Sequence, residues 1–267
     1  MDKRTAPIAV FDSGMGGISV LKQLEKLMPN ENYIYFGDSK NAPYGTKSTD
    51  EIKDLSEKAV KYLLSKNAKA IVIACNTATS AAAEYLREKY TSVPIVGLEP
   101  ALKPAALSSE HPTVVVMATP LTLREKKFAL LTEKFIDRCE IINLPAPGLV
   151  ELVEQDKIGT DEMTEYVEGL FAPLDKAEID CVVLGCTHFP FARKTIESVL
   201  GGNVRIYDGA EGEARQTRRL LEEADMLNPS EDKGTITFEN SDETKTELIC
   251  HSIEPPQLKS SHCDNKK

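Results

Sequence analysis

The sequence contains no tryptophan, no Cys-x2-Cys pair and no long apolar run. Structural zinc sites commonly use such closely spaced pairs, so the six cysteines do not predict a zinc site. No apolar run has the length of a transmembrane helix, and the N-terminal residues lack the apolar core of a signal peptide. We therefore expect a cytoplasmic protein without membrane contact, whose cysteines are reduced thiols rather than a disulfide framework.

Basic charge is also scarce. The 32 Lys and Arg residues are outnumbered by 42 Asp and Glu, which gives a formal net charge of −10 and a pI of about 5.1. A nucleic-acid-binding surface needs a basic face to neutralise phosphates, so this balance argues against a nucleic-acid partner. The length of 267 residues suits one large domain or two modest α/β domains.

Short, branched apolar runs alternate with amphipathic stretches along most of the chain. The expected strands cover residues 7–11, 32–36, 70–74 and 93–96, then 113–119, 140–144, 181–185 and 204–208. The expected helices cover residues 18–29, 51–65, 77–90, 121–134, 149–155, 161–172 and 211–224. The two halves repeat one pattern. This indicates an α/β fold of two pseudo-symmetric, doubly wound parallel-sheet domains that face each other across a cleft.

The domain boundaries follow from this repeat. We expect residues 1–97 plus 209–253 to form the first domain, with a strand at 234–240 that returns to it, and residues 98–208 to form the second. Residues 254–267 carry two prolines, charge and no apolar period, so they are expected to be a disordered tail. The pairs Cys250-His251 and His262-Cys263 have no evident neighbours that would orient them as ligands, and no metal is expected.

Two cysteines occupy matching places in the repeat. Cys75 lies between a strand and a helix, and Cys186 follows another strand 111 positions later. Ligands bind at this edge of open α/β sheets, and a helix N-terminus is expected to stabilise a thiolate at Cys75. A single such cysteine would more often be a small buried core residue, but the matched pair favours a site. Cys139 and Cys181 are expected to be structural.

Polar residues gather at the same strand ends. A glycine turn at 14–17 lacks both the GxGxxG pattern and the Walker lysine, so it is interpreted as a simple strand-to-helix turn. Convergence of the strand ends would surround a small ligand with polar groups. Those groups are Asp12, Ser13, Asn76, Thr77, Thr187 and His188.

Two thiols on opposite walls of one cleft suit the inversion of a carbon stereocentre. One group removes the α-proton from one face of the carbon, and the other donates a proton to the opposite face. An unperturbed thiol has a pKa of about 8.5, close enough to neutrality for the group to serve as either acid or base.

Four stretches, in this order, resemble the glutamate racemases of the cofactor-independent aspartate/glutamate racemase family. They are FDSGMGGISVL at 11–21, YFGDSKNAPYGTKS at 35–48, VIACNTATSAA at 72–82 and VVLGCTHFPF at 182–191. The resemblance implies interconversion of L- and D-glutamate without a cofactor or metal. It also implies a homodimer in a bacterial cytoplasm that supplies D-glutamate for peptidoglycan.

The resemblance also implies residue roles. Cys75 would act on D-glutamate and Cys186 on L-glutamate, with Asp12 and His188 assisting the two thiols. The residues implied to bind substrate are Asp12, Ser13, Pro43, Tyr44, Gly45, Asn76, Thr77, Thr119, Glu154, Thr187 and His188.

The chain departs from the family pattern at three positions. Glu125 and Phe128 replace a Ser and a Tyr, and Glu151 stands at a position that is usually apolar or Pro. These departures bear on dimer contacts and regulation. The open alternatives are a racemase of aspartate or hydantoins or a maleate isomerase, a thiol hydrolase that uses Cys186 with His188, and a non-catalytic dicarboxylate-binding protein.

Overall fold

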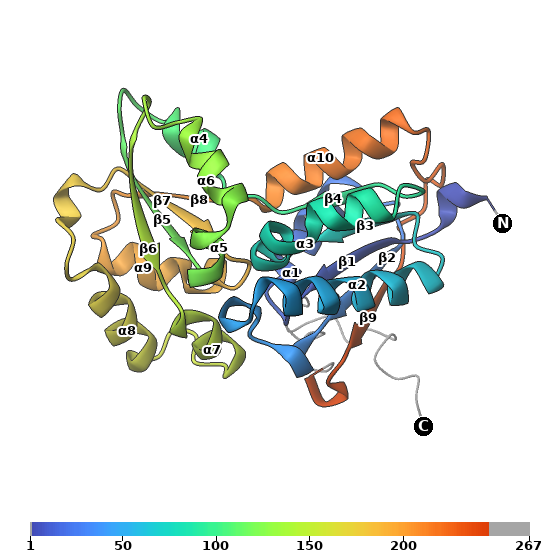
Figure 1. Ribbon diagram of the computed structural model, residues 1–267, viewed down its shortest axis with the longest axis horizontal. Helices are drawn as coiled ribbons and strands as arrows, with labels where there is room; N and C mark the ends of the chain where they lie inside the picture. Colours follow the sequence, from blue (N-terminus) through green and yellow to red (C-terminus); the bar gives the residue numbers. More distant parts are fainter. Residues whose placement is uncertain (1, 246–267) are drawn as a thin grey trace.

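The computed structural model describes residues 2–245 and contains two parallel sheets that lie side by side (Figure 1). The first sheet has the strand order β4-β3-β1-β2-β9. Its strands are β1 Ile8–Asp12, β2 Tyr33–Gly37, β3 Ala70–Ile73, β4 Ile95–Gly97 and β9 Ile236–Asn240. All its pairings are parallel, because helical crossovers return the chain to the same edge before each new strand.

The second sheet has the order β6-β5-β7-β8. Its strands are β5 Thr113–Ala118, β6 Glu140–Pro145, β7 Cys181–Gly185 and β8 Arg205–Asp208. Read from its other edge, this order is β8-β7-β5-β6, which matches the order β4-β3-β1-β2 of the first four strands of the chain. The two sheets therefore repeat one topology. The predicted fold class, two parallel-sheet α/β units, is confirmed.

The chain returns to the first sheet after the second is complete. Helix α10, Ala210–Glu223, packs beside α1, Ile18–Leu27, and β9 then pairs with the outer side of β2. The exact domain boundaries stay a prediction. The expected tail at 254–267 and the two Cys-His pairs lie outside the described residues.

The remaining helices cover the faces of both sheets (Figure 1). They are α2 Thr49–Ser65, α3 Asn76–Lys89, α4 Leu102–Ala106, α5 Pro120–Arg124, α6 Lys126–Glu133, α7 Gly148–Glu154, α8 Asp161–Phe171 and α9 Arg193–Val199. None of the helices within residues 2–245 is long and apolar enough to span a membrane.

The helix expected at 121–134 is two helices. Glu125 separates α5 from α6 with an extended backbone at φ −69° and ψ 138°, and its Oε1 accepts a hydrogen bond from Thr49 Oγ1 at 2.6 Å. Phe128, the next departure from the family pattern, is buried in the core of the second sheet. The short helices α4 and α9 were not predicted: α4 has only five residues, and α9 buries only Ile196, so neither shows a repeating apolar pattern.

Apolar packing joins the two units. The central strands β1 and β3 are nearly continuous apolar runs because helices bury both of their faces, and every residue of these two strands is buried. One core cluster contains Val10 and Val72 from the first sheet together with Val115 and Val182 from the second. The units therefore share a core, and this fixes how their strand ends face each other.

Candidate active site

The strand ends of the two sheets meet at one small cavity. Asp12 ends β1 and Cys75 follows β3, whereas Thr119 follows β5 and Cys186 follows β7. The cavity has a volume of about 20 Å³ and is lined by Ser13, Pro43, Tyr44, Gly45, Thr46, Cys75, Thr77, Thr119, Pro120, Pro147, Val150, Glu151, Cys186 and His188. The two thiols therefore line one space, each carried by a different sheet.

Cys75 caps a helix, yet its thiol is held in the neutral form. Its Sγ accepts a hydrogen bond from the Ala78 N–H at 3.4 Å and lies 3.5 Å from Ser13 Oγ. Burial, followed by the nearby Asp12 carboxylate, raises the pKa of Cys75 to about 12. The contacts with Ser13 and Ala78 oppose this shift without cancelling it. The helix N-terminus favours the thiolate through the Ala78 N–H, as expected, but desolvation outweighs this effect.

Cys186 has an imidazole beside it. The Sγ atom lies 3.8 Å from Nδ1 of His188, and Nε2 of the same ring lies 2.8 Å from Glu154 Oε1. The ring is 2% exposed. Burial lowers the pKa of His188, but the contacts with Cys186 and Glu154 more than offset it, so the pKa lies well above its ordinary value. His188 is therefore an imidazolium that donates to Glu154 and faces the sulfur.

Two hydrogen bonds connect the units behind the cavity. Glu154, at the end of α7, also accepts the Met15 N–H at 2.9 Å, and Thr187 Oγ1 donates to Asp12 Oδ2 at 2.9 Å. The glycine turn allows this approach: a Cβ on Gly14 would lie 2.1 Å from Glu154 Oε1. Close approach to the second unit, and not chain reversal alone, explains this glycine.

A loop after β2 forms another wall. Tyr44, whose side chain is fully buried, donates its hydroxyl to Asp38 Oδ2 at 2.6 Å. Burial and then Asp38 raise the pKa of Tyr44 far above its usual range, so the phenol stays protonated. Gly45 packs against Thr119; a Cβ there would lie 2.8 Å from the Thr119 Cβ. The loop is thereby pressed onto the end of β5.

Buried hydroxyls form a second polar group in the wall. Thr77 Oγ1 lies 3.0 Å from Thr119 Oγ1, and Thr122 Oγ1 lies within 3.4 Å of both. Asn76 is directed away from this group, with its Nδ2 donating to the Leu98 carbonyl at 3.4 Å.

The predicted site residues thus occupy two layers. Ser13, Pro43, Tyr44, Gly45, Cys75, Thr77, Thr119, Cys186 and His188 line the cavity. Asp12, Glu154 and Thr187 stand behind them: Thr187 is bonded to Asp12, and Glu154 is bonded to His188 of the cavity wall. Asn76 is buried beside the cavity without lining it.

Several residues of the site were not predicted. Thr46, Pro120, Pro147 and Val150 line the cavity, and Asp38 and Thr122 support it. Asp38 carried a usable signal, because it directly follows β2 just as Asp12 ends β1. Glu151, noted in the sequence only as a departure, lines the cavity, and its buried Oε2 has no hydrogen-bond partner.

Comparison with known proteins gives consistent matches. The family model for Asp/Glu/Hydantoin racemase matches residues 14–217. The chain is 51% identical over 249 residues to a glutamate racemase of Clostridium novyi, covering 93% of this chain and 96% of the relative. It is 50% identical over 241 residues to one of Clostridium botulinum, covering 90% and 93%. The crystal structure of glutamate racemase from Francisella tularensis in complex with D-glutamate superposes with a TM-score of 0.81 at 28% identity, covering 94% of each chain.

Proposed function

The chain belongs to the Asp/Glu/hydantoin racemase family, and on this premise we propose that Cys75 and Cys186 interconvert L- and D-glutamate by proton transfer at the α-carbon. The observation that supports this mechanism most strongly is the pair of thiols lining one cavity from two different sheets. A planar carbanion between them would present one face to each sulfur. Proton removal and proton return can then occur on opposite faces, which inverts the centre.

The neighbours of the two sulfurs suggest their resting forms. Cys75 is a neutral thiol because its pKa is raised to about 12, so it holds a proton ready to donate. Beside Cys186, the His188 imidazolium can hold a negative charge on sulfur by electrostatic attraction. In the direction from L to D, the Cys186 thiolate takes the α-proton, and the Cys75 thiol protonates the opposite face.

This assignment balances the protons. After one inversion, Cys75 is the thiolate and Cys186 the thiol. Reaction of D-glutamate restores the first form directly, and exchange with solvent restores it between turnovers. Asp12 makes the Cys75 thiolate unfavourable, which favours return of the proton to that sulfur.

Substrate binding requires movement of the walls. A volume of about 20 Å³ holds roughly one water molecule, far less than glutamate occupies. The loop carrying Tyr44 and Gly45 and the hydroxyls of Ser13, Thr77 and Thr119 would surround the substrate once it has entered. We propose that glutamate enters when the two units, or this loop, move apart.

The wider setting belongs to the same proposal. The relatives named above are bacterial. We propose that the chain acts as a homodimer in the bacterial cytoplasm and supplies D-glutamate for peptidoglycan, with no cofactor taking part.

The decisive experiment follows deuterium and handedness together. The protein is dialysed against a chelator and a carbonyl-trapping reagent, then incubated with L-glutamate in deuterated water. We expect D-glutamate with deuterium at the α-carbon. Activity that returns only with a metal or pyridoxal phosphate would contradict the proposed mechanism. Faster turnover of aspartate than of glutamate would identify aspartate as the substrate. Binding without turnover would support a dicarboxylate-binding protein.

A further inference from the structure

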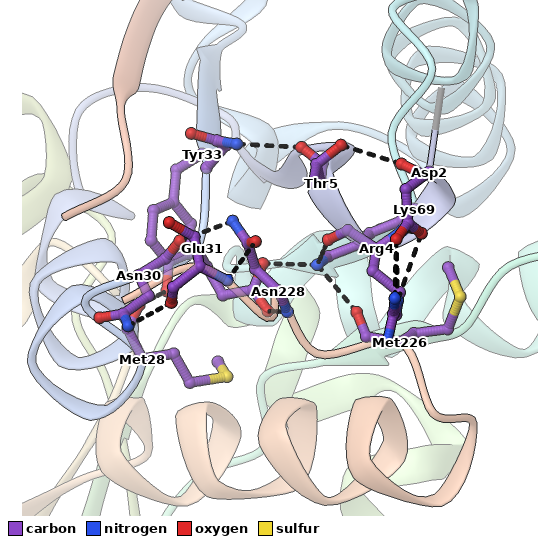
Figure 2. A network of polar contacts seen from close by, with 12 residues as sticks. Asp2, Arg4, Thr5, Met28, Asn30, Glu31, Tyr33, Lys69, Met226 and Asn228 are labelled. Atoms are coloured by element: carbon purple, nitrogen blue, oxygen red, sulfur yellow. Dashed lines mark hydrogen bonds and ion pairs between the residues drawn. The ribbon is translucent and has the colours of Figure 1, made fainter. Parts of the chain in front are cut away.

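The last described strand, β9, lies beyond residues 14–217, where the racemase family model matches. Hydrogen bonds nonetheless hold the segment that precedes this strand in place. Lys69 donates to the Met226 carbonyl at 2.9 Å and pairs with Glu31, and the two charged side chains are 1% and 2% exposed. Figure 2 shows this network, in which the Asn228 N–H also donates to Glu31 Oε1 at 2.8 Å. The segment that leads into β9 is therefore anchored to the first sheet.

A second set of contacts guides the chain from this anchor into β9. Thr235 donates its N–H to Asn32 Oδ1 at 2.9 Å, and Gly234 donates to the Pro29 carbonyl at 2.9 Å. A Cβ on Gly234 would lie 1.8 Å from the Glu31 carbonyl oxygen, so only glycine permits this approach. Strand β9 then runs parallel to β2 in a fixed register from Tyr33 onward.

The far end of β9 holds the chain that follows β2. Ser241 donates its N–H to the Gly37 carbonyl at 2.9 Å, and its Oγ accepts the Lys40 N–H at 2.9 Å. Asn240 Nδ2 donates to Ser39 Oγ at 2.9 Å. The side chains of Asn240, the last residue of β9, and of Ser241, directly after it, therefore hold the turn at Ser39–Asn41.

This turn opens the loop that forms a wall of the active-site cavity. Asp38, directly before the turn, accepts the Tyr44 hydroxyl at 2.6 Å and the Asn41 side-chain amide at 2.9 Å. Tyr44 and Gly45 line the cavity. A displacement of the turn would therefore also displace Tyr44 and Gly45, because Asp38 and Tyr44 are bonded within the same loop.

We propose that Asn240 and Ser241 are positioning residues for the racemase reaction, because they hold the loop at 38–46 in the place where it receives substrate. The proposal rests on the proposed function. Neither residue lines the cavity, and both thiols lie on other elements. Loss of the contacts should therefore weaken substrate binding and leave proton transfer nearly intact.

The neighbouring residue supplies a matched control. Glu239, also on β9, accepts the Tyr62 hydroxyl at 2.6 Å and pairs with Lys66 at 3.0 Å, both on α2. Glu239→Gln changes a residue of the same strand but removes no contact with the loop at 38–46. A general loosening of β9 would affect this variant too, whereas the proposed role concerns only Asn240 and Ser241.

The test compares Ser241→Ala, Asn240→Ala, the conservative Ser241→Thr and Glu239→Gln in steady-state racemisation. For the two alanine variants we expect the KM for glutamate to rise about 5- to 10-fold, the loss expected for one hydrogen bond, with kcat within about twofold of wild type. Ser241→Thr keeps the accepting Oγ and should restore KM, and Glu239→Gln should leave it unchanged. An equal rise in Glu239→Gln, or a fall in kcat alone, would overturn the proposal.

Hydrogen exchange separates this proposal from the proposed function. The amides of residues 38–46 should exchange about tenfold faster in Ser241→Ala than in wild type, and at the wild-type rate in Glu239→Gln. This measurement needs no turnover, so it tests the contact even if glutamate is not the substrate. Unchanged exchange in both alanine variants would show that β9 does not hold the loop.

Discussion

The two thiols are almost equally buried, at 5% and 7% exposed, but their surroundings differ in kind. Cys75 caps the 14-residue helix α3, beside a hydroxyl and near the Asp12 carboxylate. Cys186 precedes a short 3-10 helix, Phe189–Ala192, and faces an imidazolium. The pKa of Cys75 is raised even though its thiol caps a long helix. Nearby charges and burial therefore decide the protonation state here, and the helix terminus contributes only a smaller correction.

Removing either sulfur should have the largest effect. Cys75→Ala and Cys186→Ala should each lower racemisation by at least about 10³-fold, because each removes the acid or base from one face. Serine at either position should be almost as damaging, since its hydroxyl is a far weaker acid. The measurement is the rate of D-glutamate formation from L-glutamate.

Cys139→Ala is the matched control, because Cys139 is buried in the second unit and does not line the cavity. It should keep near wild-type activity. Substantial racemisation by Cys75→Ala or Cys186→Ala would contradict the mechanism in which each thiol serves one face.

The role of His188 should appear as a difference between enantiomers. Equilibrium between enantiomers cannot change, so the comparison uses exchange of the α-proton into solvent without inversion, measured separately from each enantiomer. His188→Asn should slow exchange from L-glutamate by about 10- to 100-fold and exchange from D-glutamate less, because the imidazolium serves Cys186. Equal losses would mean that His188 holds substrate instead.

Glu154 should tune this asymmetry through the protonation of His188. Contacts with Cys186 and Glu154 raise the pKa of His188, so Glu154→Gln should lower that pKa. The imidazolium would then be lost at lower pH, and the alkaline limb of kcat/KM should move down with it. A nuclear magnetic resonance titration of His188, assigned with His188→Asn, measures the pKa directly.

Glu151→Gln is the control for that titration. Glu151 lies on the same helix and lines the cavity, but it makes no hydrogen bond to His188. It should leave the pKa of His188 close to wild type. The same shift in both variants would mean that overall negative charge, rather than the bond to Glu154, sets the pKa.

The sequence predicted the parallel sheets because they follow from local patterns. Buried strands are short and branched, and both Asp12 and Cys75 come where such a run ends. The carboxyl ends of parallel strands share one edge, so these side chains could be placed together without a structure. The fold class and the racemase family were confirmed, while the individual catalytic roles stay predictions.

Other features depend on contacts that no local pattern records. The break at Glu125 is accompanied by a bond to Thr49, which is distant in sequence. The bond between Glu154 and the Met15 N–H spans 139 positions and explains why Gly14 is a glycine. The direction of the pKa shift at Cys75 likewise depends on burial, which the motif alone could not supply.

The smallest effect is a change in stability at alkaline pH that isolates Cys75. Its pKa in the folded protein is raised from 9.0 to about 12, so the folded state keeps the proton where the unfolded chain has lost it. This contribution is fully present below about pH 9 and is lost as pH rises towards about 12, at up to about 1.4 kcal/mol per pH unit. Cys75→Ala lacks the group. The difference in unfolding free energy between wild type and Cys75→Ala, measured by urea denaturation, should therefore be constant from pH 6 to about 8 and shift against wild type above about pH 9. Parallel curves across that range would mean that Cys75 ionises equally in both states, and the contrast between the two thiols would then have to rest on His188 alone.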